Sequence, residues 1–124
     1  MKKLFLLTLL LSLFISYSQA QISHDLEIFS EDGLKFTLIV NGRIINDTPQ
    51  SNVKISNIEN DYVQIVIKFE NGELATIKKK YLQIADPGTG AKYPVSTVYK
   101  IILKKGKYKL KFVSRSDKKI QYVY

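Results

Sequence analysis

Lysines at alternating positions are the residues of this chain best suited to bind a partner. Over residues 107–112, lysine alternates with Tyr108, Leu110 and Phe112. Side chains of a strand point alternately to its two faces, so these lysines share one face. Two lysines before the Lys105-Gly106 turn lie beside them if the segment forms a hairpin. The predicted cationic face consists of Lys100, Lys104, Lys107, Lys109 and Lys111.

This cationic face has a functional and a structural interpretation. Functionally, it would dock an anionic glycan, a lipid headgroup or an acidic protein. Structurally, lysine on strands also prevents edge-to-edge aggregation. The sequence does not place the further lysines at 78–80 and 118–119. Tyr93, in the stretch rich in Pro and Gly between Asp86 and Pro94, is the tyrosine best placed to stack on a sugar ring.

Catalytic constellations are scarce in this chain. It has no cysteine and one histidine, His24, which lies near the start of the predicted mature chain, where we expect fraying. The Glu31-Asp32-Gly33 segment and the segment following Asp86 fit ordinary turns better than calcium loops. We therefore expect no enzyme, no metal site and no cofactor.

The first twenty residues have the pattern of an export signal. Lys2 and Lys3 precede an apolar run over 4–15, and Ser18-Gln19-Ala20 fits a cleavage site. The expected mature protein, residues 21–124, is a soluble periplasmic or extracellular protein. Without cysteine it has no site for a lipid anchor. No transmembrane segment is expected, because the apolar run is too short to be retained as a span.

Charge is unevenly distributed along the mature chain. Residues 21–77 hold four basic and nine acidic residues, whereas residues 78–124 hold thirteen basic and two acidic ones. This asymmetry favours an anionic partner. Nucleic acid is not expected, because of the compartment and because Arg115 is the only arginine near the lysines.

Apolar residues with a period of two, interrupted by turn residues, predict an all-β fold. Val63, Ile65, Ile67 and Phe69 should share a core face, and Asn41-Gly42 should form a tight hairpin turn. Residues 21–124 are expected to form a single antiparallel β-sandwich of about seven to nine short strands, with a small Greek-key barrel as the alternative. In the lysine-rich hairpin, the residues predicted to face inward are Tyr99, Ile101, Leu103, Tyr108, Leu110 and Phe112.

A final strand is predicted over 120–124. It is apolar and ends the chain, so its edge could pair with a partner sheet. The candidate edge residues are Ile120, Tyr122 and Tyr124.

The first half of the mature chain resembles the N-terminal β-domain of exported Bacteroidota proteins of unknown function, whose longer members carry a helical C-terminal domain. A weaker likeness is to surface modules of the PEGA type. Both resemblances imply an exported β-module without catalytic residues. The matching residues are Ile28-Phe29-Ser30-Glu31-Asp32-Gly33, Phe36-Thr37-Leu38, Asn41-Gly42, Asn46, Pro49-Gln50 and Asn52-Val53.

Two functions therefore follow as hypotheses. The first is a non-catalytic binding or structural module of the bacterial envelope, docking an anionic glycan or lipid headgroup through the lysine-rich hairpin. The alternative is a protein–protein assembly module that uses an exposed edge strand.

Overall fold

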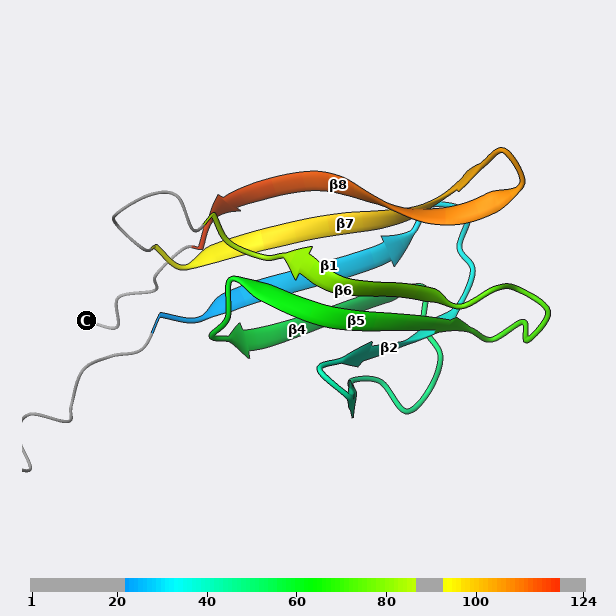
Figure 1. Ribbon diagram of the computed structural model, residues 1–124, viewed down its shortest axis with the longest axis horizontal. Coiled ribbons are helices and arrows are strands. Elements are labelled where there is room, and N and C mark those ends of the chain that lie inside the picture. The colour runs from blue at the N-terminus through cyan, green and yellow to red at the C-terminus, as the bar shows by residue number, and fades with distance from the viewer. Residues whose placement is uncertain (1–21, 87–92, 119–124) are drawn as a thin grey trace, which may run out of the picture.

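The computed structural model describes residues 22–86 and 93–118, and these form two packed β-sheets (Figure 1). No strand of one sheet pairs with a strand of the other in this part of the chain, so the sandwich is open rather than a closed barrel. The prediction of an all-β sandwich is confirmed. The strands are β1 His24–Ser30, β2 Phe36–Val40, β3 Arg43–Ile44, β4 Asn52–Ile58, β5 Tyr62–Phe69, β6 Ile77–Gln83, β7 Val95–Lys104 and β8 Lys107–Asp117.

The strand order places the first strand inside a sheet. Sheet A runs β4-β1-β7-β8 and sheet B runs β3-β2-β5-β6. All pairs are antiparallel except β1 with β7, which is parallel and differs from the expected antiparallel sheet. A parallel pair needs a long crossover connection. Sheet B and β4, which lie between β1 and β7 in the sequence, supply it.

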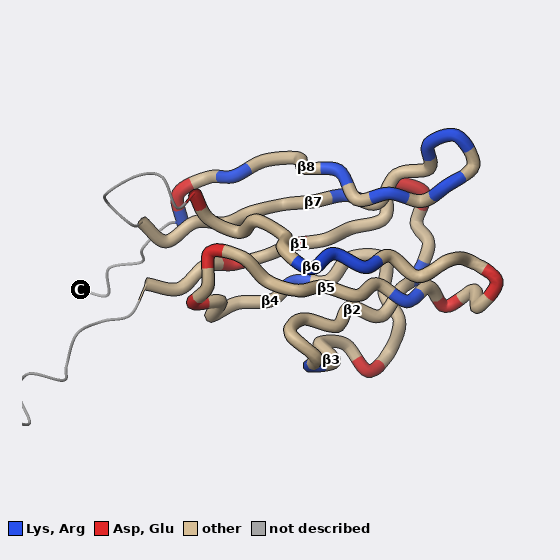
Figure 2. The backbone as a smooth tube through the Cα atoms, viewed as in Figure 1, with Lys and Arg blue, Asp and Glu red and all other residues tan. Residues whose placement is uncertain are grey.

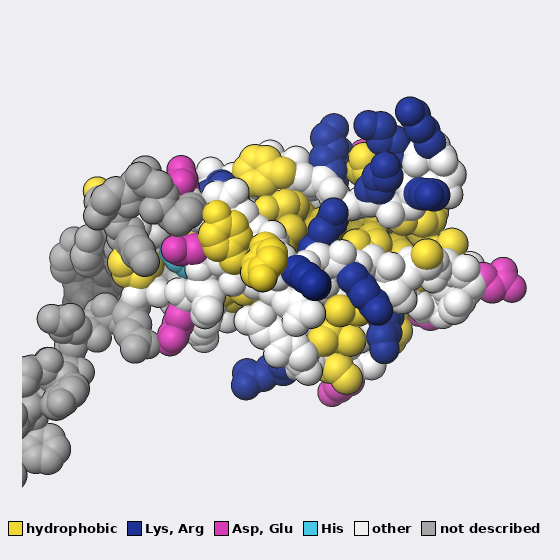
Figure 3. Space-filling model, viewed as in Figure 1, with side chains coloured by type: hydrophobic (Ala, Val, Ile, Leu, Met, Phe, Trp, Pro, Cys, Tyr) yellow, Lys and Arg dark blue, Asp and Glu magenta, His cyan; other side chains and the backbone are white. Residues whose placement is uncertain are grey.

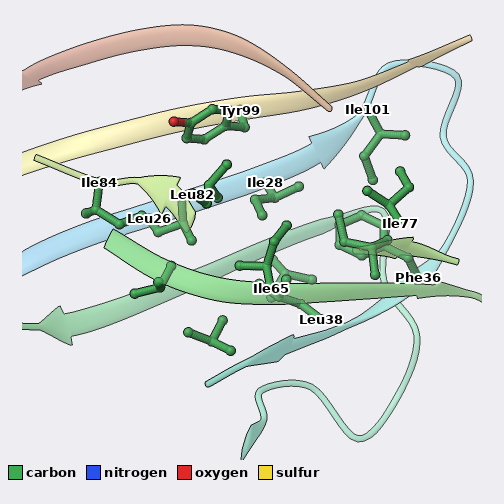
Figure 4. Close-up of a cluster of buried hydrophobic side chains, with 14 of the residues drawn as sticks. Leu26, Ile28, Phe36, Leu38, Ile65, Ile77, Leu82, Ile84, Tyr99 and Ile101 are labelled. Carbon is green, nitrogen blue, oxygen red and sulfur yellow. The ribbon is translucent and has the colours of Figure 1, made fainter. Parts of the chain in front are cut away.

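The core lies between the two sheets and is formed by alternating positions of the strands (Figure 4). Along β5, Val63, Ile65, Ile67 and Phe69 are all buried, as the pattern predicts. Within residues 22–86 and 93–118, no helix has the length and apolar character that a membrane span requires.

The edge of β2 is covered although β3 contains only two residues. The side chain of Asn46 is buried; its Oδ1 accepts a hydrogen bond from the Leu38 amide at 2.8 Å, and its Nδ2 donates to the Phe36 carbonyl at 2.8 Å. The side-chain amide of Asn46 thus supplies to β2 the hydrogen bonds that a neighbouring strand would otherwise make. At the other edge of sheet B, β6 pairs with no further strand within residues 22–86 and 93–118.

The hairpin of β7 and β8 extends beyond the body of the sandwich at its turn (Figure 1). Leu103, predicted to face inward, is 58% exposed. It lies on the expected face, but sheet B does not reach far enough to cover it. Leu103 therefore faces inward as predicted, but it remains exposed near the turn.

His24 is also placed differently from the expectation of a frayed terminus. It is 2% exposed, and its Nδ1 accepts a hydrogen bond from the Val95 amide at 3.1 Å. Its Nε2 lies 4.0 Å from a carboxylate oxygen of Asp61. Burial lowers the pKa of His24, although Asp61 opposes this effect. β1 begins inside the fold because β4 and β7 flank it.

The lowered pKa predicts a loss of stability in mild acid. Unfolded chains bind a proton at His24 near pH 6.5, whereas the folded protein resists it until lower pH. The stabilisation is therefore complete above pH 6.5 and is lost as the pH falls toward the folded value. Urea unfolding between pH 7.5 and 5.5 should show a falling free energy of unfolding. His24→Gln should flatten this dependence, since His24 is the sole histidine; an unchanged slope would contradict the prediction.

The turns of two hairpins share one backbone geometry but differ in sequence. Asn41 and Gly42 have φ values of 48° and 80°, and Lys105 and Gly106 have 52° and 77°. Asparagine is well suited to the left-handed conformation, whereas lysine is not. The turn between β7 and β8 therefore carries a lysine at a position where asparagine would stabilise the protein more.

Replacing Lys105 with asparagine should stabilise the protein. Lys105→Asn should raise the free energy of unfolding by about 0.5 kcal/mol, because asparagine accepts a positive φ at lower cost. Lys105→Gln removes the same charge without that preference and serves as the control in urea denaturation. Equal effects of both substitutions would assign the gain to charge instead.

Candidate functional site

The lysines predicted to share a face occur together on the outer face of sheet A. Lys104 pairs with Lys107 and Lys100 pairs with Lys111, and Lys109 lies opposite Ile102. Lys100 forms an ion pair with Glu31 at 3.1 Å. The other four have no ion pair with any residue in the described part of the chain. We call these five residues the outer lysine face.

A groove that no sequence pattern predicts adjoins this face. β6 and β8 are the free edges of sheets B and A on the same side of the sandwich, and Lys78, Lys79 and Lys80 lie on β6. Figure 2 shows basic residues on β6 and around the β7–β8 turn. The space between the strands has a volume of about 650 Å³. We call it the lysine groove; its walls include Leu74, Ile77, Lys78 and Lys79 on one side and Lys107, Tyr108, Lys109 and Leu110 on the other.

The lysine groove has an apolar floor and charged rims. Lys107 and Lys109 lie on the outer face of sheet A and Lys78 lies on the outer face of sheet B, so these three border the groove at its rims. Lys79 pairs with the fully buried Ile65, so its side chain lies on the inward face of sheet B, at the edge nearest β8. Ile77 is buried, and Leu110 is packed against the core. Figure 3 shows hydrophobic side chains exposed between the basic residues of the two hairpins. Among residues 22–86 and 93–118, Lys78, Lys79, Lys107 and Lys109 have no ion-pair partner.

One end of the space between β6 and β8 is closed by hydrogen bonds. Arg115 donates from Nε to the Ile84 carbonyl at 2.9 Å and from an Nη to the Gln83 carbonyl at 3.2 Å. The hydroxyl of Tyr99 donates to the Gln83 carbonyl, and that of Thr97 donates to the Ile84 carbonyl. We call these contacts the edge tie. They join the two sheets although no strand pairing does.

A bulge in β8 turns Arg115 toward the edge tie. Val98 pairs with Ser114 but Tyr99 pairs with Phe112, so β8 has one extra residue there. Phe112 and Arg115 consequently lie on the same face, and the guanidinium is 5.1 Å from the ring centroid. Burial raises the pKa of Tyr99, which keeps its hydroxyl a donor. Phe112, predicted to face inward, does so but remains 48% exposed because it lies on an edge strand.

Tyr108 fixes the lysine groove near the turn of the hairpin. Its ring centroid is 5.3 Å from that of Phe69 in sheet B, and its hydroxyl donates to Asp32 at 2.8 Å. Hydrogen bonds from the hydroxyls of Ser30 and Tyr108 lower the pKa of Asp32. The same bond to Asp32 raises the pKa of Tyr108. The carboxylate of Asp32 is therefore occupied by turn and sheet donors, as the turn interpretation predicts.

Both edges that flank the lysine groove carry features that oppose strand addition. β6 has a bulge over 79–82, opposite Val63 and Ile65, and β8 has its bulge at Val113. Bulges and inward-pointing charges such as Lys79 interrupt the regular edge that an added strand needs. The two edges are thus better suited to binding through side chains than through backbone pairing.

Other predicted site residues lie elsewhere. Tyr93 is 63% exposed but precedes β7, so the ten residues of that strand, about 33 Å, separate it from Lys104. The structure does not bring Tyr93 to the lysines. The candidate edge residues Ile120, Tyr122 and Tyr124, like the predicted signal at 1–20, lie outside the described residues.

The described residues include no group of three or more histidine and carboxylate side chains able to hold a metal ion. In comparisons with family models, curated proteins and solved structures, nothing matches the chain.

Removing the edge tie should destabilise the fold. Arg115→Met leaves the Gln83 and Ile84 carbonyls with fewer donors and removes the contact with Phe112, so the free energy of unfolding should fall by about 2 kcal/mol. Lys54→Met, on the opposite edge of sheet A, is the matched control and should change it by less than about 0.5 kcal/mol. Equal losses in thermal or urea unfolding would contradict the role of the tie.

Proposed function

We propose that this protein is a non-catalytic, exported binding module of the bacterial envelope that docks an anionic glycan in the lysine groove. The observation that carries the proposal is a groove bordered by lysines of two different sheets that have no ion-pair partner among the described residues. Export is inferred from the leader pattern of residues 1–20.

Cross-strand repulsion supports an anionic ligand. Lys104 and Lys107 lie directly opposite each other, as do Lys100 and Lys111, and only Lys100 is paired with an acid. Like charges in such positions destabilise a sheet. Lys107 also borders the lysine groove, so an anion bound there would relieve its repulsion with Lys104, and binding and folding would favour each other at this pair.

The floor of the lysine groove supports a glycan over a lipid surface. Sugar rings have apolar faces and polar rims, which suit apolar residues such as Ile77 and Leu110 between lysine walls. A flat membrane would meet the outer lysine face and the hairpin turn but would not enter the groove. The bulges of β6 and β8 also make an acidic protein that adds a strand a poorer fit.

The test is an NMR titration with soluble anionic peptidoglycan fragments, lipopolysaccharide and phosphatidylglycerol vesicles at low and moderate salt. We expect the glycan probes to shift the amide signals of Ile77, Lys79 and Leu110, and the shifts to weaken as salt screens the charges. Shifts confined to the outer lysine face with vesicles would indicate a lipid ligand, and no shift with any probe would overturn the proposal.

Charge variants sharpen this test. Combining Lys79→Gln, Lys107→Gln and Lys109→Gln should weaken glycan binding at least about ten-fold, since three charge contacts are lost. Combining Lys35→Gln, Arg43→Gln and Lys54→Gln removes the same charge from outside the lysine groove. Equal weakening by both triple variants would show that net charge, and not the groove, attracts the ligand.

A further inference from the structure

We infer that the ligand of the lysine groove is a linear acidic polysaccharide with a charge on successive sugars, held by both walls at once. This inference rests on the proposed function and specifies its ligand class. It excludes a single terminal phosphate or carboxylate as the recognised group.

The walls are held at a set separation. The edge tie joins β8 to the Gln83 and Ile84 carbonyls beyond one end of the lysine groove. Toward the other end, the ring of Tyr108 packs on Phe69 and its hydroxyl binds Asp32. A ligand therefore meets two preformed walls, which lowers the cost of engaging both together.

Charge recurs along the walls. Lys107 and Lys109 are two residues apart on one strand, so their Cα atoms are separated by about 6.6 Å along it. On the opposite side Lys79 points inward, whereas Lys78, which pairs with Val66, lies at the outer rim. One small anion could contact only part of this array, whereas a chain with repeated carboxylates can satisfy several lysines in turn. Linked contacts of this kind strengthen one another through effective concentration.

The lysine groove also has a closed end and an open end. The edge tie lies beyond the lysine pairs, so a chain that continues along the groove leaves toward Gly106 and the loop that carries Glu73. Figure 2 shows acidic residues at the β5–β6 turn, at the same end as the lysine-rich turn. Glu73 is therefore the lining carboxylate that a longer anionic chain approaches as it leaves.

The experiment uses linear oligogalacturonates of one, two, four and eight sugars, titrated into the protein at 0.15 M salt. The dissociation constant should fall at least about ten-fold from two sugars to eight. A longer chain can also occupy a short site in several positions, but this statistical effect would lower the dissociation constant only a few-fold. Amide shifts should reach Lys79 and Lys109 together. Affinity that is independent of length, or shifts on only one wall, would overturn the inference.

Single variants test each wall separately. Lys79→Gln and Lys109→Gln should each weaken binding of the four-sugar chain about three- to five-fold, while Lys54→Gln leaves it unchanged. Glu73→Gln should strengthen binding of the eight-sugar chain more than that of the two-sugar chain. Equal effects on both lengths would contradict the assigned direction of the chain.

The result also separates this inference from the proposed function. If monomeric galacturonate binds the lysine groove as tightly as the long chains, the protein still binds an anionic sugar and only the linear ligand fails. If none of the oligomers and none of the envelope probes binds, both fail together.

Discussion

The edge tie is the interaction on which the open side of this sandwich depends. In the described part of the chain, two sheets of four strands leave the outer edges of β6 and β8 without a pairing strand on the same side, and no strand pairing joins the two edges. Arg115, Thr97 and Tyr99 join them through the Gln83 and Ile84 carbonyls instead. A guanidinium suits this role because several donors in one plane can reach two carbonyls and a hydroxyl. Arg115 is therefore engaged within the fold, whereas the lysines of the groove have no ion-pair partner among the described residues.

The lysine groove exists because the edge tie closes the space between β6 and β8 at one end only. Beyond the edge tie, no strand pairing joins the β5–β6 and β7–β8 hairpins in the described residues. The space between these two hairpins is lined by residues of both. Lysine there serves the fold by interrupting a free edge, and in the proposed function it also presents charge to the ligand. These roles are compatible, since an edge that rejects another strand remains available to a flexible anionic chain. Lys105 in a left-handed turn position and lysines opposite each other in the hairpin both cost stability. A purely solubilising role of these lysines does not account for that cost in stability.

Much of the local structure could be predicted from the sequence. The Asn41-Gly42 turn, the strand from Tyr62 to Phe69 and the shared face of the five lysines all depend on neighbouring residues, because side chains alternate with a period of two and asparagine with glycine accepts positive φ. The sequence alone therefore determined an all-β fold with a cationic hairpin. His24 was misjudged because its burial depends on β4 and β7, which lie far away in the chain.

Only the tertiary structure decided that lysines of the two sheets lie near each other. The order β3-β2-β5-β6 exposes the edge that carries Lys78 and Lys79, and the order β4-β1-β7-β8 exposes the edge that carries Lys107 and Lys109. No local pattern encodes that both edges are on the same side of the sandwich, nor that Arg115 joins them. Tyr93 is close in sequence to the lysine hairpin but lies at the far end of β7. Sequence fixes the face of a side chain through the strand period, whereas strand order, set by the packing of the whole core, decides its distant neighbours.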